Sequence, residues 1–349
     1  MAGYFKAVRW TGDGSGGGRA LTLGFQPEYG WTRQSTVGGS VRGFLFGLTT
    51  SYCNMGDQNG NWTAATGANK ITATATGVTL DSEYNTLGAT YIGLFWVSAS
   101  QIAYRLSYTG NATARSVNHS LGVSPDFIYP QWYPASGSGG NDVTLLSMPL
   151  TRGFGMVNIQ DFGIAGNNKF TTANNNIWNS SAPSSTVYSL GGAALQLNTN
   201  TRLYYAMMFA NSTGFCKTGT YVGNGAANGA AINLGFAPTA IQINRADNVN
   251  NGDLPYTFAA VMTDPAGATS PWTKFFLMPD NQAWRTDANG IVISGNTFAP
   301  PLSVNTTGVT YSYIAWSEAD TSGGGGGGAP GWPSGGGGRR MPILPDTRR

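Results

Sequence analysis

Short runs of β-branched and aromatic residues alternate along this chain with Gly, Asn, Asp, Ser and Pro. Two examples are the runs at 91–96 and 240–243. Runs of this length and composition are typical of β-strands joined by tight turns. Surface-helix formers are scarce, with three Glu and five Lys in 349 residues, so we expect little helix. The pattern predicts an all-β protein.

One frame of glycine, proline and tyrosine recurs three times. In each copy the first glycine stands 12 residues before the second and 15 before the proline, and an Asn stands six residues before the tyrosine. Such fixed spacings mark internal repeats, and the copies differ in length only in their middles. The frame positions are Gly12, Gly24, Pro27 and Tyr91; Gly110, Gly122, Pro125 and Tyr204; and Gly223, Gly235, Pro238 and Tyr311.

We interpret the frame as scaffold and not as chemistry. The first glycine and the Asp or Asn after it indicate a tight turn, and we expect these two residues to supply its positive φ. The proline ends one strand and sets the start of the next, since it cannot donate to a central ladder. The aromatic strand that opens at the tyrosine must then return to pair near the first strand of its copy.

Each copy has about 100 residues of short strands, for which two packed antiparallel sheets are the usual solution. We therefore expect three tandem, related β-sandwich-like domains, at residues 1–104, 105–215 and 216–320. Residues 321–349 change abruptly to Gly, Pro and Arg and are predicted to form an attachment arm without a core. Candidate docking residues of the arm are Trp332, Arg339, Arg340, Ile343 and Leu344.

The charge balance argues against a polyanionic partner. Without the four Arg and one Asp of the arm, the 19 basic and 16 acidic residues become 15 and 15. A nucleic-acid binder needs a clustered basic face, so no nucleic acid is expected. The chain has no apolar stretch of 18 residues and no signal-like start, so neither membrane insertion nor secretion is expected.

Candidate catalytic residues are few. His119 is the single histidine; it is predicted to be a turn or surface residue, and no Ser-His-Asp arrangement accompanies it. A glycosidase usually needs two placed carboxylates, but the acid after the frame proline, Glu28 in copy one and Asp126 in copy two, becomes Thr239 in copy three. We interpret these carboxylates as surface caps or strand-end partners, so no catalytic residue is predicted.

The remaining motifs also indicate structure. Cys53 and Cys216 lack metal-ligand spacing and are expected to be buried free thiols. The glycine-rich stretch at 14–18 has no Walker lysine after it and is interpreted as a hairpin loop. The sequence therefore predicts no metal and no cofactor.

Aromatic residues in the variable middles are candidates for binding, because exposed rings on loops stack on sugars or anchor protein contacts. A small core beneath a long loop is the alternative. These residues are Trp62, Trp132, Tyr133, Trp178, Trp272 and Trp284.

The frame resembles a repeat domain of virion proteins of tailed bacteriophages, of the kind found in phages of marine bacteria. Copy one carries the resemblance best, and copy two keeps part of it at 125–127 and 152–153. Copy three lacks the Arg-Gly element and has Thr239 where the acid should be. The motifs of copy one are Trp10-Thr11-Gly12-Asp13-Gly14, Leu23-Gly24-Phe25-Gln26-Pro27-Glu28, Val41-Arg42-Gly43 and Asn85 to Tyr91.

The resemblance implies a non-enzymatic virion structural protein, assembled in the host cytoplasm. We expect a tail fibre, spike, baseplate or tail-tip component whose loops are available for host attachment. A capsid decoration protein, acting as a cement or head fibre, is the first alternative, and a polysaccharide-degrading tailspike is the second. Expected partners are other virion proteins, further copies of this chain and a host-surface glycan or protein.

Overall fold

The computed structural model describes residues 3–36, 41–45, 52–55, 63–65, 71–133, 145–151, 155–159, 170–172, 179, 181–192, 198–245, 255–264, 269–277 and 283–318. This part of the chain is mostly antiparallel β structure, so the all-β prediction is confirmed. It forms several small sheets and one eight-stranded sheet that curls into a half-barrel. The helical elements in it are α2 (Ala260–Thr263), η1 (Ser82–Tyr84) and η2 (Leu302–Val304).

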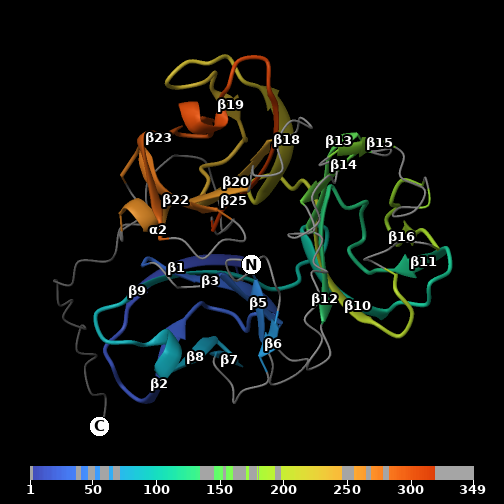
Figure 1. Ribbon diagram of the computed structural model, residues 1–349, viewed down its shortest axis with the longest axis horizontal. Coiled ribbons are helices and arrows are strands. Elements are labelled where there is room, and N and C mark those ends of the chain that lie inside the picture. Colours follow the sequence, from blue (N-terminus) through green and yellow to red (C-terminus); the bar gives the residue numbers. More distant parts are fainter. Residues whose placement is uncertain are drawn as a thin grey trace, which may run out of the picture.

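The first repeat, drawn from blue to cyan in Figure 1, contributes two sheets. Trp10, Val78 and Phe95 belong to a buried cluster that both sheets supply. The six-stranded sheet has the order β1 (Phe5–Thr11), β9 (Thr90–Trp96), β3 (Tyr29–Gln34), β4 (Val41–Leu45), β5 (Tyr52–Met55) and β6 (Thr63–Ala65). The three-stranded sheet has the order β2 (Gly17–Thr22), β8 (Gly77–Asp81) and β7 (Ile71–Thr74).

The second repeat also forms a six-stranded sheet, with a two-stranded sheet beside it. Leu121, Ile128 and Tyr188 pack together in the cluster of this repeat. The larger sheet has the order β10 (Ala103–Thr109), β17 (Leu203–Phe209), β12 (Phe127–Tyr133), β13 (Leu145–Thr151), β14 (Gly155–Ile159) and β15 (Phe170–Thr172). The smaller one pairs β11 (Arg115–Asn118) with β16 (Val187–Leu190).

The third repeat differs because its strands form one continuous sheet. Strand β23 is ten residues long and pairs with β22 at one end and β24 at the other, so it carries the sheet around a corner. The order is β18 (Cys216–Val222), β25 (Thr310–Trp316), β20 (Ala240–Arg245), β21 (Tyr256–Ala259), β22 (Trp272–Leu277), β23 (Arg285–Ser294), β24 (Thr297–Ala299) and β19 (Ile232–Asn233).

The three frames have the same strand register. In each repeat the closing strand pairs along all seven residues with the first strand, as expected from the sequence. The frame tyrosine is the second residue of that closing strand. Its ring stacks on the aromatic ring opposite, at 5.3 Å for Trp10 and Tyr91, 5.1 Å for Tyr108 and Tyr204 and 5.2 Å for Tyr221 and Tyr311. The spacings in the sequence therefore correspond to one repeated piece of geometry.

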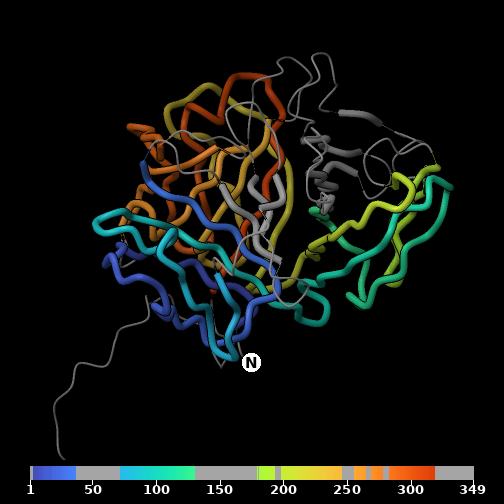
Figure 2. The backbone as a smooth tube through the Cα atoms, turned by 60° about the horizontal axis from the view of Figure 1, so that its bottom comes forward, coloured from blue at the N-terminus to red at the C-terminus, as the bar shows by residue number. Residues whose placement is uncertain are grey.

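The three larger sheets share a central core. Side chains of all three repeats meet there in one buried cluster, which includes Trp31, Tyr129 and Ile314. The last aromatic residues of the closing strands, Trp96, Phe209 and Trp316, belong to this cluster and are fully buried. Their ring centroids are 6.0, 5.6 and 5.3 Å apart, so they form a triangle. Figure 1 shows the three sheets around this centre, and Figure 2 shows the same chain path tilted.

Candidate functional site

The acids that follow the frame proline act at the junctions between repeats. The Glu28 carboxylate accepts the amide N–H of Ser98 at 2.8 Å and also the Ser98 hydroxyl, and the Asp126 carboxylate accepts the amide N–H of Asn211 at 2.8 Å. In the third repeat the Thr239 hydroxyl accepts the Glu318 amide N–H at 3.1 Å. Each of the three side chains therefore accepts the backbone N–H of a residue just after the closing strand. This agrees with the interpretation of the acids as strand-end partners.

The residues that these groups hold form the next link. Ser98, Asn211 and Glu318 each stand two residues after the closing aromatic of their repeat. The Ser98 hydroxyl accepts the Arg105 amide N–H at 3.0 Å, and the Asn211 side-chain oxygen accepts the Thr218 amide N–H at 2.6 Å. Each linker thus bonds to the first strand of the following repeat.

Glu318 extends the same arrangement from the third repeat back to the first. Its Oε1 accepts the Ala7 amide N–H at 2.7 Å, and its Oε2 lies 2.6 Å from the Lys6 ammonium group. The Tyr4 hydroxyl donates to the Phe215 carbonyl, and the two rings meet edge to face. The three repeats are therefore joined in a closed ring of equivalent contacts, of which the third joins residues 311 positions apart.

An aspartate or asparagine turn follows the first strand of every repeat, and a buried asparagine holds it in place. The side-chain oxygens of Asn85, Asn198 and Asn305 each accept the amide N–H of the turn's Asp or Asn at 3.1 Å. Their amide groups donate to the carbonyl two residues further along the turn, at 3.2, 2.7 and 2.9 Å. The constant Asn in the sequence is thus a structural clamp.

The first glycine of the frame is needed for a different reason from the one expected. A Cβ on Gly12, Gly110 or Gly223 would lie 1.9, 2.0 or 2.1 Å from the carbonyl oxygen of the residue after the clamp asparagine. The positive φ belongs instead to the residue two positions later, at 74° for Gly14 and 57° for Ala112. Close backbone approach, and not φ, therefore demands the glycine.

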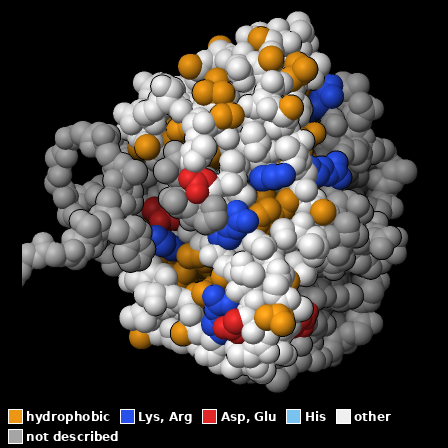
Figure 3. Space-filling view, turned by 90° about the vertical axis from the view of Figure 1, so that its left-hand side faces the viewer, with side chains coloured by type: hydrophobic (Ala, Val, Ile, Leu, Met, Phe, Trp, Pro, Cys, Tyr) orange, Lys and Arg blue, Asp and Glu red, His pale blue; other side chains and the backbone are white. Residues whose placement is uncertain are grey.

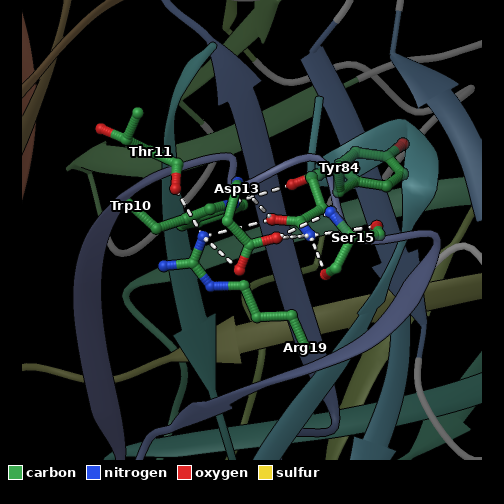
Figure 4. A network of polar contacts seen from close by, with 7 residues as sticks. Trp10, Thr11, Asp13, Ser15, Arg19 and Tyr84 are labelled. Carbon is green, nitrogen blue, oxygen red and sulfur yellow. Dashed lines mark hydrogen bonds and ion pairs between the residues drawn. The ribbon is translucent and has the colours of Figure 1, made fainter. Parts of the chain in front are cut away.

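The turn of the first repeat carries charge. Hydrogen bonds from Ser15, then from Asn85, together with the nearby Arg19 charge, lower the pKa of Asp13 to about 2. One guanidinium nitrogen of Arg19 donates to the Thr11 carbonyl and to the side-chain oxygen of Asn85, and it lies 3.7 Å from an Asp13 carboxylate oxygen (Figure 4). The Arg19 guanidinium therefore supplies the positive charge that lies beside the Asp13 carboxylate.

His119 is buried, so the expectation that it could be a surface residue is wrong. It follows β11 and is 5% exposed. The Leu121 amide N–H donates to Nδ1 at 3.3 Å, so the proton lies on Nε2, which donates to the Ser184 carbonyl at 3.2 Å. Burial lowers the pKa of His119. The ring is a neutral structural bridge with both nitrogens in use.

The aromatic candidates separate into two groups. Trp272 is 3% exposed and packs in the core of the third repeat, so its ring offers no face to a ligand. Trp284 is half-buried against the central core, with the Arg9 guanidinium 5.6 Å from its ring centroid. The backbones of Trp132 and Tyr133 belong to β12, but their side chains are not described. Trp62 and Trp178 lie outside the described residues.

Parts of the variable middles pack against neighbouring repeats. The Arg9 guanidinium donates to the Met262 carbonyl at the end of α2, at 3.1 Å. The Trp284 amide N–H donates to the Ser35 carbonyl at 3.1 Å. Both contacts join the third repeat to the first, so this middle covers a junction between repeats. The arm candidates Trp332, Arg339, Arg340, Ile343 and Leu344 lie outside the described residues.

Reactive groups in the described part of the chain are few. Cys216 is a buried free thiol in the central core, and its pKa is raised by burial and by the nearby Asp126 charge. The glycine-rich loop after β1 leads into β2 of another sheet and is not a hairpin. Within the described ranges, no three His, Cys, Asp or Glu residues gather as metal ligands, and no helix there is long and apolar enough to span a membrane.

One protein family matches this chain. It is a domain family of unknown function, DUF7483, and the match covers residues 97–320. This range begins directly after Trp96 and takes in the second and third copies of the frame. A search of curated proteins gives no match. Because the matched range is more than half of the 349 residues, the chain belongs to the DUF7483 family.

Proposed function

We propose that this protein is a non-enzymatic structural component of a bacteriophage virion, placed in the tail as a fibre, spike or tip. The observation that carries the proposal is the use of chemistry-bearing side chains for architecture. Glu28 and Asp126 hold linkers, Asn85 clamps a turn and both nitrogens of His119 are bonded within the fold. The resemblance of the repeat frame to virion repeat domains supplies the virion part of the proposal.

Within this proposal the repeats act as three β-sandwich-like domains, at 1–104, 105–215 and 216–320. The support is the shared register of first, closing and third strands. The separate layers of the first two repeats and the joined layers of the third are then two forms of one sandwich. The domain boundaries and the binding roles of Trp62, Trp132, Tyr133 and Trp178 stay predictions.

The direct test of location is labelling. Antibodies against the purified chain, marked with gold, are applied to particles of the phage that encodes it, and the particles are imaged by electron microscopy. Gold at the tail end is the expected result. Gold distributed over the head would instead favour a capsid decoration protein, and particles without label at any dilution would overturn the virion assignment.

The absence of catalysis is a separate proposal with its own test. Purified protein is incubated with surface polysaccharide of the host, and reducing ends are measured over time. We expect no release above a heat-treated control. Release that disappears in Glu28→Gln or Asp126→Asn would show a depolymerase and would overturn the non-enzymatic assignment.

The arm and the loop aromatics complete the proposal. Deleting 321–349 should leave a folded body that no longer enters particles, whereas normal incorporation would contradict an attachment role. Trp62→Ala and Trp178→Ala should weaken binding to host cells, with Leu87→Ala as the control because Leu87 is exposed and lies outside the middles. Equal binding by all three variants would remove these aromatics from recognition.

A further inference from the structure

The first and third repeats are in contact without a peptide link between them, and the structure describes this contact residue by residue. The Glu318 carboxylate accepts the Ala7 amide N–H and pairs with the Lys6 ammonium group. Beside them the Tyr4 hydroxyl donates to the Phe215 carbonyl. The same contacts form whether the two repeats belong to one chain or to two.

The contact continues along β1, against which α2 lies (Figure 1). The Arg9 guanidinium donates to the Met262 carbonyl at 3.1 Å and lies 5.6 Å from the ring centroid of Trp284. Phe5 and Trp316 meet in the central core, with their ring centroids 6.0 Å apart. The third repeat therefore offers an apolar centre bordered by a carboxylate and by backbone carbonyls. This surface is complementary to a first repeat, which brings an aromatic ring and two cations.

The first repeat has a core of its own, so it can move as one body. One of its buried clusters is made only of residues between Val8 and Val97. The DUF7483 match begins at residue 97 and does not include this repeat. Residues 97–320 therefore correspond to the family domain, and the first repeat occupies a place beside it.

The linker between the first two repeats holds backbone strain that the second linker avoids. Gln101 and Gly214 each stand five residues after the closing aromatic of their repeat, with φ of 62° and 83°. A positive φ is costly for glutamine but not for glycine. Opening the first linker breaks the two backbone hydrogen bonds between Ala99 and Ala103 and the bond from Gln101 to the Leu121 carbonyl, and it releases this strain. The first linker is therefore the hinge on which the first repeat swings once the third junction opens.

We propose that two copies of this chain exchange their first repeats. In the exchanged dimer each ring contains the second and third repeats of one copy and the first repeat of the other, so the contacts between repeats are made again. The extended chain from Ser98 to Ala103 spans at most about 18 Å, so the two rings lie side by side. Exchange of an identical element is a low-cost route to a dimer. The inference concerns the chain itself, does not rest on its place in a virion, and identifies the surface for the homo-oligomer expected from the sequence.

Concentration decides between the closed monomer and the exchanged dimer. A first repeat tethered by a short flexible linker competes for its own place at an effective concentration on the order of 1 mM. Dilute chains should therefore close on themselves. Exchange should occur where copies are crowded or fold together at high concentration.

The test uses the ion pair between Lys6 and Glu318 as its marker. Full-length chains with normal and heavy nitrogen are mixed, unfolded in guanidinium chloride and refolded together at about 1 mM, the effective concentration of the tether. Monomer and dimer are separated, and a carbodiimide joins the Lys6 amine to the Glu318 carboxylate, which lie 2.6 Å apart. We expect cross-linked peptides of mixed label in the dimer and of single label in the monomer. Glu318→Gln is the control that removes the cross-link.

Two outcomes would contradict exchange. A dimer whose cross-links all carry a single label would consist of closed rings that associate by another surface. Refolding that gives only monomer at this concentration would show that the first repeat always returns to its own chain.

Matched variants test the hinge. Gln101→Val raises the cost of the positive φ, and Gln101→Gly removes it. We expect the dimer fraction of Gln101→Val to exceed that of Gln101→Gly by about tenfold or more. Ala112→Val is the control, because Ala112 has a φ of 57° in a turn that joins no two repeats, and its dimer fraction should equal that of the unchanged chain. Equal dimer fractions in the two Gln101 variants would overturn the proposal.

Discussion

Two of the three junctions in this molecule are continuous chain, and the third is not. At the first two, the linker turns back on itself, with Ala99 bonded to Ala103 at 2.8 Å and Ser212 bonded to Cys216 at 2.9 Å. At the third, Glu318 meets Ala7 from the other end of the chain and adds an ion pair with Lys6. The geometry is the same in all three, but the group that accepts the amide N–H of the next first strand differs. It is a neutral Ser or Asn side chain at the first two junctions, where the Glu28 and Asp126 carboxylates hold the linker, and a carboxylate at the junction without a peptide link.

The comparison teaches how a ring is closed when the chain does not close it. Where the peptide backbone already holds two repeats together, a neutral Ser or Asn acceptor is present. Where two distant segments must be held, the acceptor is a carboxylate. Hydrogen bonds to charged groups contribute about 1.5–3 kcal/mol, against about 1 kcal/mol for neutral ones. Because no peptide link joins the first and third repeats, we expect the ring to open first at the third junction, even though its hydrogen bond is made to a charged group.

The largest expected effect comes from Trp316→Ala, because Trp316 lies in the aromatic triangle that all three junctions share. A buried Trp→Ala change costs about 3–5 kcal/mol, measured by guanidinium unfolding. Trp272→Ala is the control, since Trp272 is also buried but packs only within the third repeat. Amide exchange at Ala7, Val97 and neighbouring junctions should accelerate in Trp316→Ala alone. Exchange confined to the third repeat in both variants would contradict a shared core.

Glu318→Ala has the second largest expected effect on stability and tests the third junction directly. It removes the acceptor of the Ala7 N–H and the partner of Lys6, so we expect a loss of about 1–3 kcal/mol and fast exchange at Ala7. Glu318→Gln keeps an acceptor and should recover most of the protection. Asn211→Ala, at a continuous junction, should cost less than Glu318→Ala. An equal cost at both sites would remove the distinction between the junctions.

A circular permutant exchanges the two kinds of junction and has a smaller expected effect. Residue 318 is joined to residue 3 by about four residues, and the chain is opened between Ser100 and Gln101, since exposed loops accept new termini. The protein should fold, the effect of Glu318→Ala should fall by about 1 kcal/mol, and that of Ser98→Ala should rise by a similar amount. An unchanged order of the two effects would show that connectivity does not determine their size.

The smallest expected effect is a pH dependence at the first junction. Leu121 connects His119 to the linker, because its N–H donates to Nδ1 of His119 and its carbonyl accepts the Gln101 N–H at 2.8 Å. Burial lowers the pKa of His119 from its usual 6.5, so the unfolded chain takes up the proton first. Stability should therefore be full above about pH 6.5 and decline as the pH falls below that value.

His119→Gln should flatten this part of the stability profile in urea unfolding between pH 7 and pH 5. Exchange at Gln101 is the local readout, because its amide N–H bonds to the Leu121 carbonyl. A wild-type profile that is flat over the same range, with unchanged exchange at Gln101, would contradict the assignment of His119 as a neutral bridge.

The sequence predicted the features whose cause is local. Fixed spacings located the turns at Gly12 and its equivalents and the closing strands that begin beside each frame tyrosine, because turn geometry and strand register repeat with the sequence. The expected reason for the glycine, a positive φ, was wrong. Gly12 is required because the Thr86 carbonyl, 74 positions further along the chain, lies too close for a Cβ. No turn pattern contains that information.

The ring of junctions could not be predicted in the same way. Ser98, Asn211 and Glu318 differ in chemistry, and the third bond joins the first strand to a residue just after the last strand. A signal was nevertheless present, because each of the three stands two residues after the closing aromatic. Likewise Trp284 belongs to a middle that was expected to serve ligand binding, but its half-buried ring packs against the central core.

Figure 3 shows one side of the molecule on which charged side chains of both signs are few and lie among mostly uncharged surface. Such a surface gives the folding chain little electrostatic repulsion to keep separate molecules apart.

The closing bond between Ala7 and Glu318 has a consequence for biosynthesis, because it joins the first strand to a residue made near the end of translation. During translation each repeat can collapse around its own cluster, but the aromatic triangle stays incomplete until the last strand emerges. Between the synthesis of Phe209 and that of Trp316 the nascent chain carries two of the three rings of the triangle without the third, and slow or stalled elongation in this interval should favour aggregation over folding.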